Sequence, residues 1–145
     1  MNDIIIKLNE LILVQDYNIN EFSQEIFNKL TNSLKMFGCI QPLVVNEIDG
    51  KYFLIDGYTR YKILQNLNFS EVRCTVYKDL SESKSILLKL NMNLFNEYDI
   101  LKTSKVLLKI KEKIPADRLE KYTNFTKDQI EKYQSIYGWD WYIRI

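Results

Sequence analysis

Histidine is absent from the 145-residue sequence, and glycine, proline and cysteine are scarce. Without histidine, the chain cannot build a Ser-His-Asp triad or a zinc site with a histidine ligand by itself. The four glycines and two prolines leave little room for linkers or for a fold full of tight turns. The two cysteines, Cys39 and Cys74, are too few for a metal site or a disulfide framework. We therefore expect no metal centre and two reduced, buried thiols.

Long apolar runs and a strong net charge are missing too. No run approaches the roughly 20 residues that span a bilayer. The segment MNDIIIKLNE carries an acidic residue where a secretory signal would be basic. We expect a cytoplasmic protein without membrane contact. Residues 1–100 carry ten basic and thirteen acidic side chains, whereas residues 101–145 carry ten and six. Attraction to phosphate would therefore come from the last third of the chain.

Residues 1–80 predict an α/β domain. Apolar periodicity and turn signals predict strands at 4–6, 42–48, 51–56 and 72–77, with 11–14 as an extension or a further strand. Asp49-Gly50 predicts a hairpin between the two middle strands. Helices are predicted at 21–37 and 58–67. Asn20 is the expected N-cap of the first helix and Gly38 its stop, and its periodic apolar residues are expected to form one inward face.

Residues 81–145 predict only helices, at 81–94, 99–113, 116–122 and 127–137, with Gly138 as the last stop. Thr126 and Gln129 form a capping-box pattern before the final helix. Residues 116–137 have the length of a helix-turn-helix, which would present Lys127, Gln129 and Lys132 to DNA. The alternative is a helical pair that only packs. The aromatic segment 138–145 either folds back on the core or marks a partner surface.

Two segments carry candidate chemistry. Residues 38–45 read GCIQPLVV, and residues 54–61 read LIDGYTRY, in which a strand ends and a helix begins at Gly57. A glycine before a helix N-terminus lets an anion approach the exposed N–H groups, and Arg60 is placed to add a charged contact to phosphate. The alternative is that Gly57 serves the turn alone and that Arg60 pairs with Asp56 or a backbone carbonyl.

The order and spacing of these segments resemble the N-terminal domain of the ParB/sulfiredoxin superfamily. Gly38, Gln41 and Pro42 match the family's glycine-x-x-Gln-Pro loop. Gly57-Tyr58-Thr59-Arg60 stands where ParB proteins hold CTP with Gly-Glu-Arg-Arg. Asn93 matches the family's Glu-Asn-x-x-Arg segment, from which Met92 and Asn96 depart. The resemblance implies a small mixed sheet followed by helices. It also implies nucleotide or phosphate contacts at Gly38, Gln41, Pro42, Gly57, Thr59, Arg60 and Asn93.

Three functions fit this resemblance. The first is a ParB-like DNA-binding protein, for partition or for regulation of a mobile element, that takes CTP, ATP or ADP with magnesium. The second is a free-serine-type kinase, because residues 56–60 are close to that branch's Asp-Gly-x-His-Arg; Asp56 would then accept the substrate proton. The third is a nucleotide-free module whose helical half binds a protein. Sulfiredoxin chemistry is excluded, because Tyr58 replaces the catalytic cysteine. Enzyme activity stays open.

Overall fold

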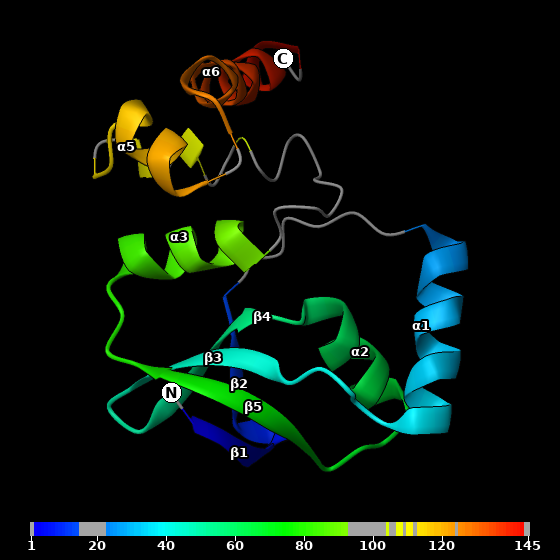
Figure 1. The fold of residues 1–145 in the computed structure, drawn as a ribbon. Coiled ribbons are helices and arrows are strands. Elements are labelled where there is room, and N and C mark those ends of the chain that lie inside the picture. Colours follow the sequence, from blue (N-terminus) through cyan, green and yellow to red (C-terminus); the bar gives the residue numbers. More distant parts are fainter. Residues whose placement is uncertain are drawn as a thin grey trace. The chain divides into compact units, whose positions relative to one another are not determined.

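The computed structural model describes residues 2–14, 23–92, 104, 107, 108, 110, 111, 113–123 and 125–143. The chain divides into two units, shown as a ribbon in Figure 1. The first, here called the α/β unit, comprises residues 1–15 and 22–80. The second, the helical unit, comprises residues 16–21 and 81–145. Each unit is described by itself.

A five-stranded mixed sheet forms the centre of the α/β unit, in the order β1-β5-β3-β4-β2. The strands β1/β5 and β3/β4 pair antiparallel, whereas β5/β3 and β4/β2 pair parallel. A short 3-10 turn, η1 (Leu8–Glu10), separates the two edge strands. The α/β class and a separate strand at 11–13 are thus established. The strands are β1 (Asn2–Lys7), β2 (Leu11–Leu13), β3 (Leu43–Ile48), β4 (Lys51–Asp56) and β5 (Glu71–Lys78).

The sheet core follows the predicted pattern. In β5, Val72, Cys74 and Val76 are buried, as their alternation predicts. Residues 43–46 of β3 are all buried instead of alternating, and β3 lies inside the sheet between β5 and β4. Asn46 lies among them, and its side-chain amide donates to the Leu80 carbonyl and accepts from the Leu80 N–H, both at 3.0 Å. The polar side chain therefore fixes the chain just after β5.

The hairpin between β3 and β4 also agrees with the prediction. Asp49 and Gly50 both have positive φ, at 52° and 75°. Two successive residues of this kind define a type I′ turn, whose twist matches that of the flanking strands. Lys51 faces Ile48 directly across the turn. The turn sets the register from Ile48–Lys51 to Val45–Leu54, and a shift between Val44 and Val45 then pairs Val44 with Asp56 at the end of β4.

Helix α1 (Gln24–Phe37) corrects two expectations. Its N-cap is Ser23, whose hydroxyl accepts from the Ile26 N–H at 3.2 Å, so the predicted cap at Asn20 is wrong. Gly38 stops the helix as predicted, with φ at 72°. Of the periodic apolar side chains, Leu34 is buried, but Phe37 is 66% exposed. Because α1 packs mainly against α2 (Tyr58–Asn66), a single neighbouring helix covers only part of its apolar stripe.

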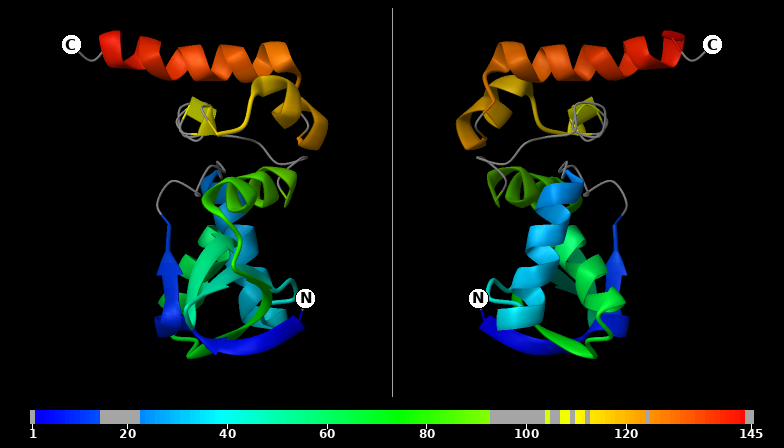
Figure 2. Two further views of the ribbon diagram at one scale, coloured as in Figure 1. Left: turned by 90° about the vertical axis from the view of Figure 1, so that its left-hand side faces the viewer. Right: turned by 90° about the vertical axis from the view of Figure 1, so that its right-hand side faces the viewer.

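The helical unit contains α3 (Glu82–Met92), α5 (Ala116–Tyr122) and α6 (Lys127–Ile143), and α5 packs on α6. Helix α6 continues through Gly138, so the predicted stop there is wrong (Figure 2). A glycine inside a helix costs only about 1 kcal/mol, and no proline follows to end it. In α3, the sequence pattern missed that Lys89 is only 1% exposed. A lysine is rarely buried, so periodicity gave no signal for it.

Most of the predicted helix at 99–113 lies outside the described residues. Leu107 and Ile110, two apolar residues of this segment, are buried. Lys111 and Lys113 are exposed, and Lys113 donates to the Glu82 carboxylate at 3.0 Å. No described helix is long and apolar enough to cross a membrane. The described residues also hold no cluster of three or more acidic or cysteine side chains arranged for a metal ion.

Candidate functional site

Gly57 joins the end of β4 to α2 (Tyr58–Asn66). Its φ is 108°, which L side chains rarely adopt, and a Cβ there would overlap with Cδ2 of Leu43. Glycine is therefore required both for the turn and for the close approach to β3. The first N–H groups of α2 have no partner within the helix, and they lie at the positive end of its dipole. The turn thus places an anion-favouring helix end beside the central strand.

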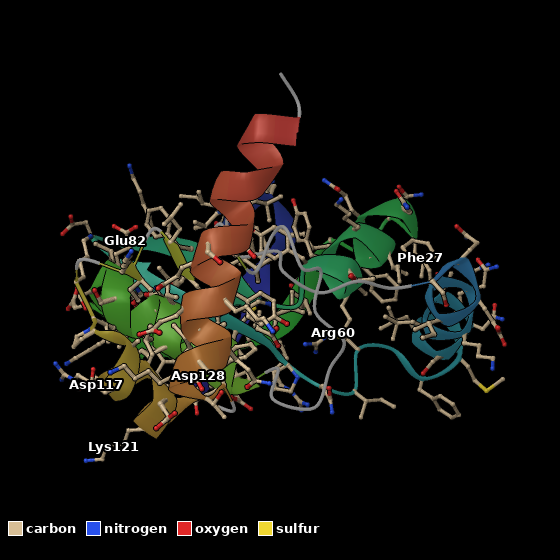
Figure 3. The ribbon with its side chains drawn as sticks, turned by 90° about the horizontal axis from the view of Figure 1, so that it is seen from above. Phe27, Arg60, Glu82, Asp117, Lys121 and Asp128 are labelled. Atoms are coloured by element: carbon tan, nitrogen blue, oxygen red, sulfur yellow. The ribbon has the colours of Figure 1, made fainter. Side chains whose placement is uncertain are left out.

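Arg60 lies in the first turn of α2 and binds the 38–42 loop to this helix. Its Nη1 donates to the carbonyls of Gln41 at 2.7 Å and Pro42 at 3.2 Å. Its Nη2 donates to the Asp56 carboxylate at 3.4 Å. Figure 3 shows Arg60 beside the loop that follows α1. The side chain is only 16% exposed, so these contacts define its position. The carbonyl and Asp56 pairing that we considered as an alternative for Arg60 is thus present.

Arg73 holds the same loop from β5. Its Nη2 donates to the Ile40 carbonyl at 2.7 Å. The carbonyls of residues 40, 41 and 42 are therefore bound by two guanidinium groups that come from a helix and a strand. Sequence reasoning missed Arg73, because it occupies an outward position of an alternating strand and belongs to no motif. Only the sheet order, which places β5 beside β3, could have brought it to this loop.

The pKa values of the two cysteine thiols reflect the burial and the charges around the loop. Burial raises the pKa of Cys39, while the positive charges of Arg60 and Arg73 oppose that rise. The Cys39 Sγ donates to the Gln41 carbonyl at 3.0 Å. Burial, aided by Cys39, raises the pKa of Cys74 to about 12. Both thiols are free and protonated at neutral pH, so the site offers positive charge rather than a thiolate nucleophile.

Most of the predicted phosphate contacts come together here. Gln41, Pro42 and Arg60 are joined by hydrogen bonds, and a Cβ on Gly57 would lie 3.4 Å from Nη2 of Arg60. Gly38 begins the loop, and Thr59 is half-buried in the first turn of α2. Asn93 lies outside the described residues. A phosphate role for these side chains stays a prediction, as does the role of Asp56 in proton transfer.

Tyr58, which departs from the family's motif, has a structural task. Its side chain is 6% exposed, and its hydroxyl donates to the Val14 carbonyl. The contact links the start of α2 to the residue after β2. A buried tyrosine needs a hydrogen-bond partner for its hydroxyl, and the open end of an edge strand supplies one. This residue therefore secures the helix start instead of presenting a charge to a ligand.

The start of α6 carries the predicted DNA contacts. The capping box is confirmed: the Thr126 hydroxyl accepts from the Gln129 N–H at 3.1 Å, and Gln129 Oε1 accepts from the Thr126 N–H at 2.9 Å. Lys127, Gln129 and Lys132 are exposed, whereas Phe125 and Ile130 at the staple positions are buried.

Acidic groups surround this helix start. The Glu120 carboxylate accepts from the Lys127 N–H, and Asp128 lies in the first turn (Figure 3). A groove of about 480 Å³ nearby is lined by basic Lys111 and Lys127 and by acidic Asp117 and Glu131. Because Glu120 occupies the end of the helix, a phosphate would meet lysine side chains rather than the helix dipole.

The comparisons with known proteins identify the family. The sequence model of the ParB N-terminal domain matches residues 2–94, which include the sheet, the 38–42 loop and the start of α2. The chain belongs to the ParB N-terminal domain family. This confirms the resemblance on which the nucleotide prediction rests.

Among family relatives, the chain is 30% identical over 113 residues to the probable chromosome-partitioning protein ParB of Campylobacter jejuni, covering 75% of the chain and 40% of the relative. It is 29% identical over 106 residues to the probable chromosome 2-partitioning protein ParB of Deinococcus radiodurans, covering 68% and 36%. It is 33% identical over 78 residues to the nucleoid occlusion protein of Bacillus pumilus, covering 52% and 26%. The chain thus spans 40% or less of the length of these relatives.

Solved ParB structures share the fold. The C-terminally truncated Caulobacter crescentus ParB complexed with CTP-gamma-S has a TM-score of 0.58 at 16% identity, with 92% of this chain and 77% of that chain covered. The same protein complexed to the centromeric parS site has a TM-score of 0.59 at 16% identity, covering 89% and 68%. A Pnob8-like ParB-N domain gives 0.64 at 22% identity, covering 77% and 46%.

Proposed function

We propose that this chain is a ParB-like DNA-binding protein whose α/β unit binds a nucleotide, CTP being the first candidate, between the 38–42 loop and the start of α2. The observation that carries the proposal is the convergence of Arg60 and Arg73 on this loop, beside the N-terminus of α2. Family membership supports it, as does the solved Caulobacter ParB complexed with CTP-gamma-S.

Each group would have a distinct task. The N–H groups at the start of α2 would donate to phosphate oxygens. Arg60 and Arg73 give two positive charges against the one negative charge of Asp56. A guanidinium has several N–H donors, so Arg60 can hold the loop and still meet a phosphate. Tyr58 and Thr59 replace charged residues of the family motif, so we expect binding without rapid hydrolysis.

Substitution of Arg60 tests the pocket. Arg60→Ala should weaken CTP binding about thirty-fold, or about 2 kcal/mol, through loss of a charge-assisted contact. Lys51→Ala, an equally basic but distant position on β4, is the control and should bind as wild type does. Titration calorimetry gives the affinities, and circular dichroism checks the fold. Unchanged affinity in folded Arg60→Ala would remove this side chain from the pocket.

Charge reversal tests DNA binding by the helical unit. Lys127→Glu with Lys132→Glu should weaken binding to a short parS duplex, measured by fluorescence anisotropy, much more than Lys35→Glu with Lys51→Glu in the α/β unit. Two to four phosphate contacts would give a shallow slope of roughly −2 to −4 for log affinity against log salt. Equal small effects of the two pairs would show that α5 and α6 are packing elements and contact no groove.

A further inference from the structure

Strand β1 is an edge of the five-stranded sheet. Among the described strands it pairs only with β5, and Figure 2 shows it at the outer margin of the α/β unit. An edge strand presents backbone N–H and C=O groups that can pair with another strand. Natural edges are often protected by proline or by a bulge, and β1 contains no proline and pairs with β5 without a register shift. Its central residue, Ile5, is 60% exposed.

The two faces of β1 differ in chemistry. Ile6 is only 2% exposed and shares the inner face with Ile4, because side chains alternate along a strand. The outer face carries Asp3, Ile5 and Lys7, all exposed. From Asp3 to Lys7 the side chains on this face are acidic, apolar and basic. In the opposite direction along the strand the order is basic, apolar and acidic. A second copy of the strand running antiparallel presents the complementary order.

One register satisfies this complementarity. Antiparallel pairing centred on Ile5 places Asp3 opposite Lys7 at both ends and Ile5 opposite its own copy. A shift of one residue joins the outer face of one strand to the inner face of the other. A shift of two residues brings a charged side chain opposite Ile5. Parallel pairing sets like charges side by side. The charges that disfavour strand pairing in the other registers form ion pairs in this one.

We propose that β1 is a self-complementary interface, through which a second copy of this chain pairs antiparallel about Ile5 across a two-fold axis. The partner is argued from charge complementarity, since opposite-charge pairs across strands are favourable and like charges are not. Asp3 also accepts from the Thr75 hydroxyl at 2.7 Å, which holds its carboxylate on this face. One strand pair buries less area than a stable dimer requires, so the dimer is weak and depends on concentration.

Sedimentation velocity of the full chain without nucleotide tests the interface. Wild type should show a dimer that grows with concentration. Lys7→Glu gives each strand two acids on its outer face, and Asp3→Lys gives each two bases, so each variant alone should dimerise at least ten-fold more weakly. An equimolar mixture of the two should regain the dimer, because both facing pairs are then of opposite charge. A simple loss of folding cannot produce that recovery.

Two controls complete the design. Lys51→Glu makes the same charge change on β4, which has β3 and β2 on its two sides, and should leave the dimer unchanged. Ile5→Lys places two lysines at the axis and should abolish the dimer without altering Asp3. A wild type that stays monomeric at the highest concentration, a dimer that survives Lys7→Glu, or a mixture without recovery would each overturn the proposal. None of these results depends on nucleotide or DNA binding.

Discussion

Gly57→Ala tests the geometry that places α2 against the sheet. At a φ of 108°, an alanine carries backbone strain of about 1–2 kcal/mol. Its Cβ would also overlap with Leu43, which is fully buried and cannot swing into solvent. Overpacking of this kind costs about 1–3 kcal/mol. We therefore expect Gly57→Ala to lower the free energy of unfolding by about 2–5 kcal/mol.

Gly50→Ala is the matched control. Its φ of 75° is also positive, but a Cβ there meets nothing within 4 Å, so only the backbone term applies. Urea denaturation followed by circular dichroism gives the free energies, and hydrogen exchange of the β3 and β4 amides restricts the readout to the α/β unit. Gly57→Ala should be the more destabilising by about 1–3 kcal/mol. Equal losses in the two variants would refute the argued contact between Gly57 and Leu43.

Two further predictions concern stability. Thr126→Ala removes the hydroxyl that caps α6 and should lower the free energy of unfolding by about 1 kcal/mol; urea denaturation checks it, and wild-type stability would contradict the capping role. Because the unfolded chain releases the Cys74 proton near pH 9.0 and the folded chain keeps it to about pH 12, stability should fall as pH rises through that window. This thiol should lower the free energy of unfolding by about 1 kcal/mol by pH 10, and Cys74→Ala should not show that decrease. Equal slopes of the free energy of unfolding against pH in both proteins would contradict the raised pKa of Cys74.

Local signals predicted much of this fold. The alternation of Val72, Cys74 and Val76, the Asp49-Gly50 turn and the Thr126 capping box each depend on residues close together in sequence. The helix ends were predicted less accurately. Ser23 replaced Asn20 as a cap, because several residues near that point can accept the first N–H bonds.

The candidate site needed tertiary information. The motif predicted that Gly57 and Arg60 lie close together, because residues three or four positions apart are neighbours on a helix. It did not predict that Arg60 would bind the carbonyls of the 38–42 loop, or that Arg73 would join it from β5. Those contacts follow from the sheet order, which no local pattern encodes. The exposure of Phe37 has the same origin, because periodicity shows an apolar stripe but not the neighbour that covers it.

The most direct test of the account is a calorimetric titration of the full chain with CTP, ATP and ADP, each with and without magnesium. A nucleotide pocket at the 38–42 loop predicts saturable CTP binding that Arg60→Ala weakens about thirty-fold. Binding of ATP or ADP in place of CTP would keep the pocket and change its ligand. Absence of binding by all three nucleotides at millimolar concentration would contradict the central claim.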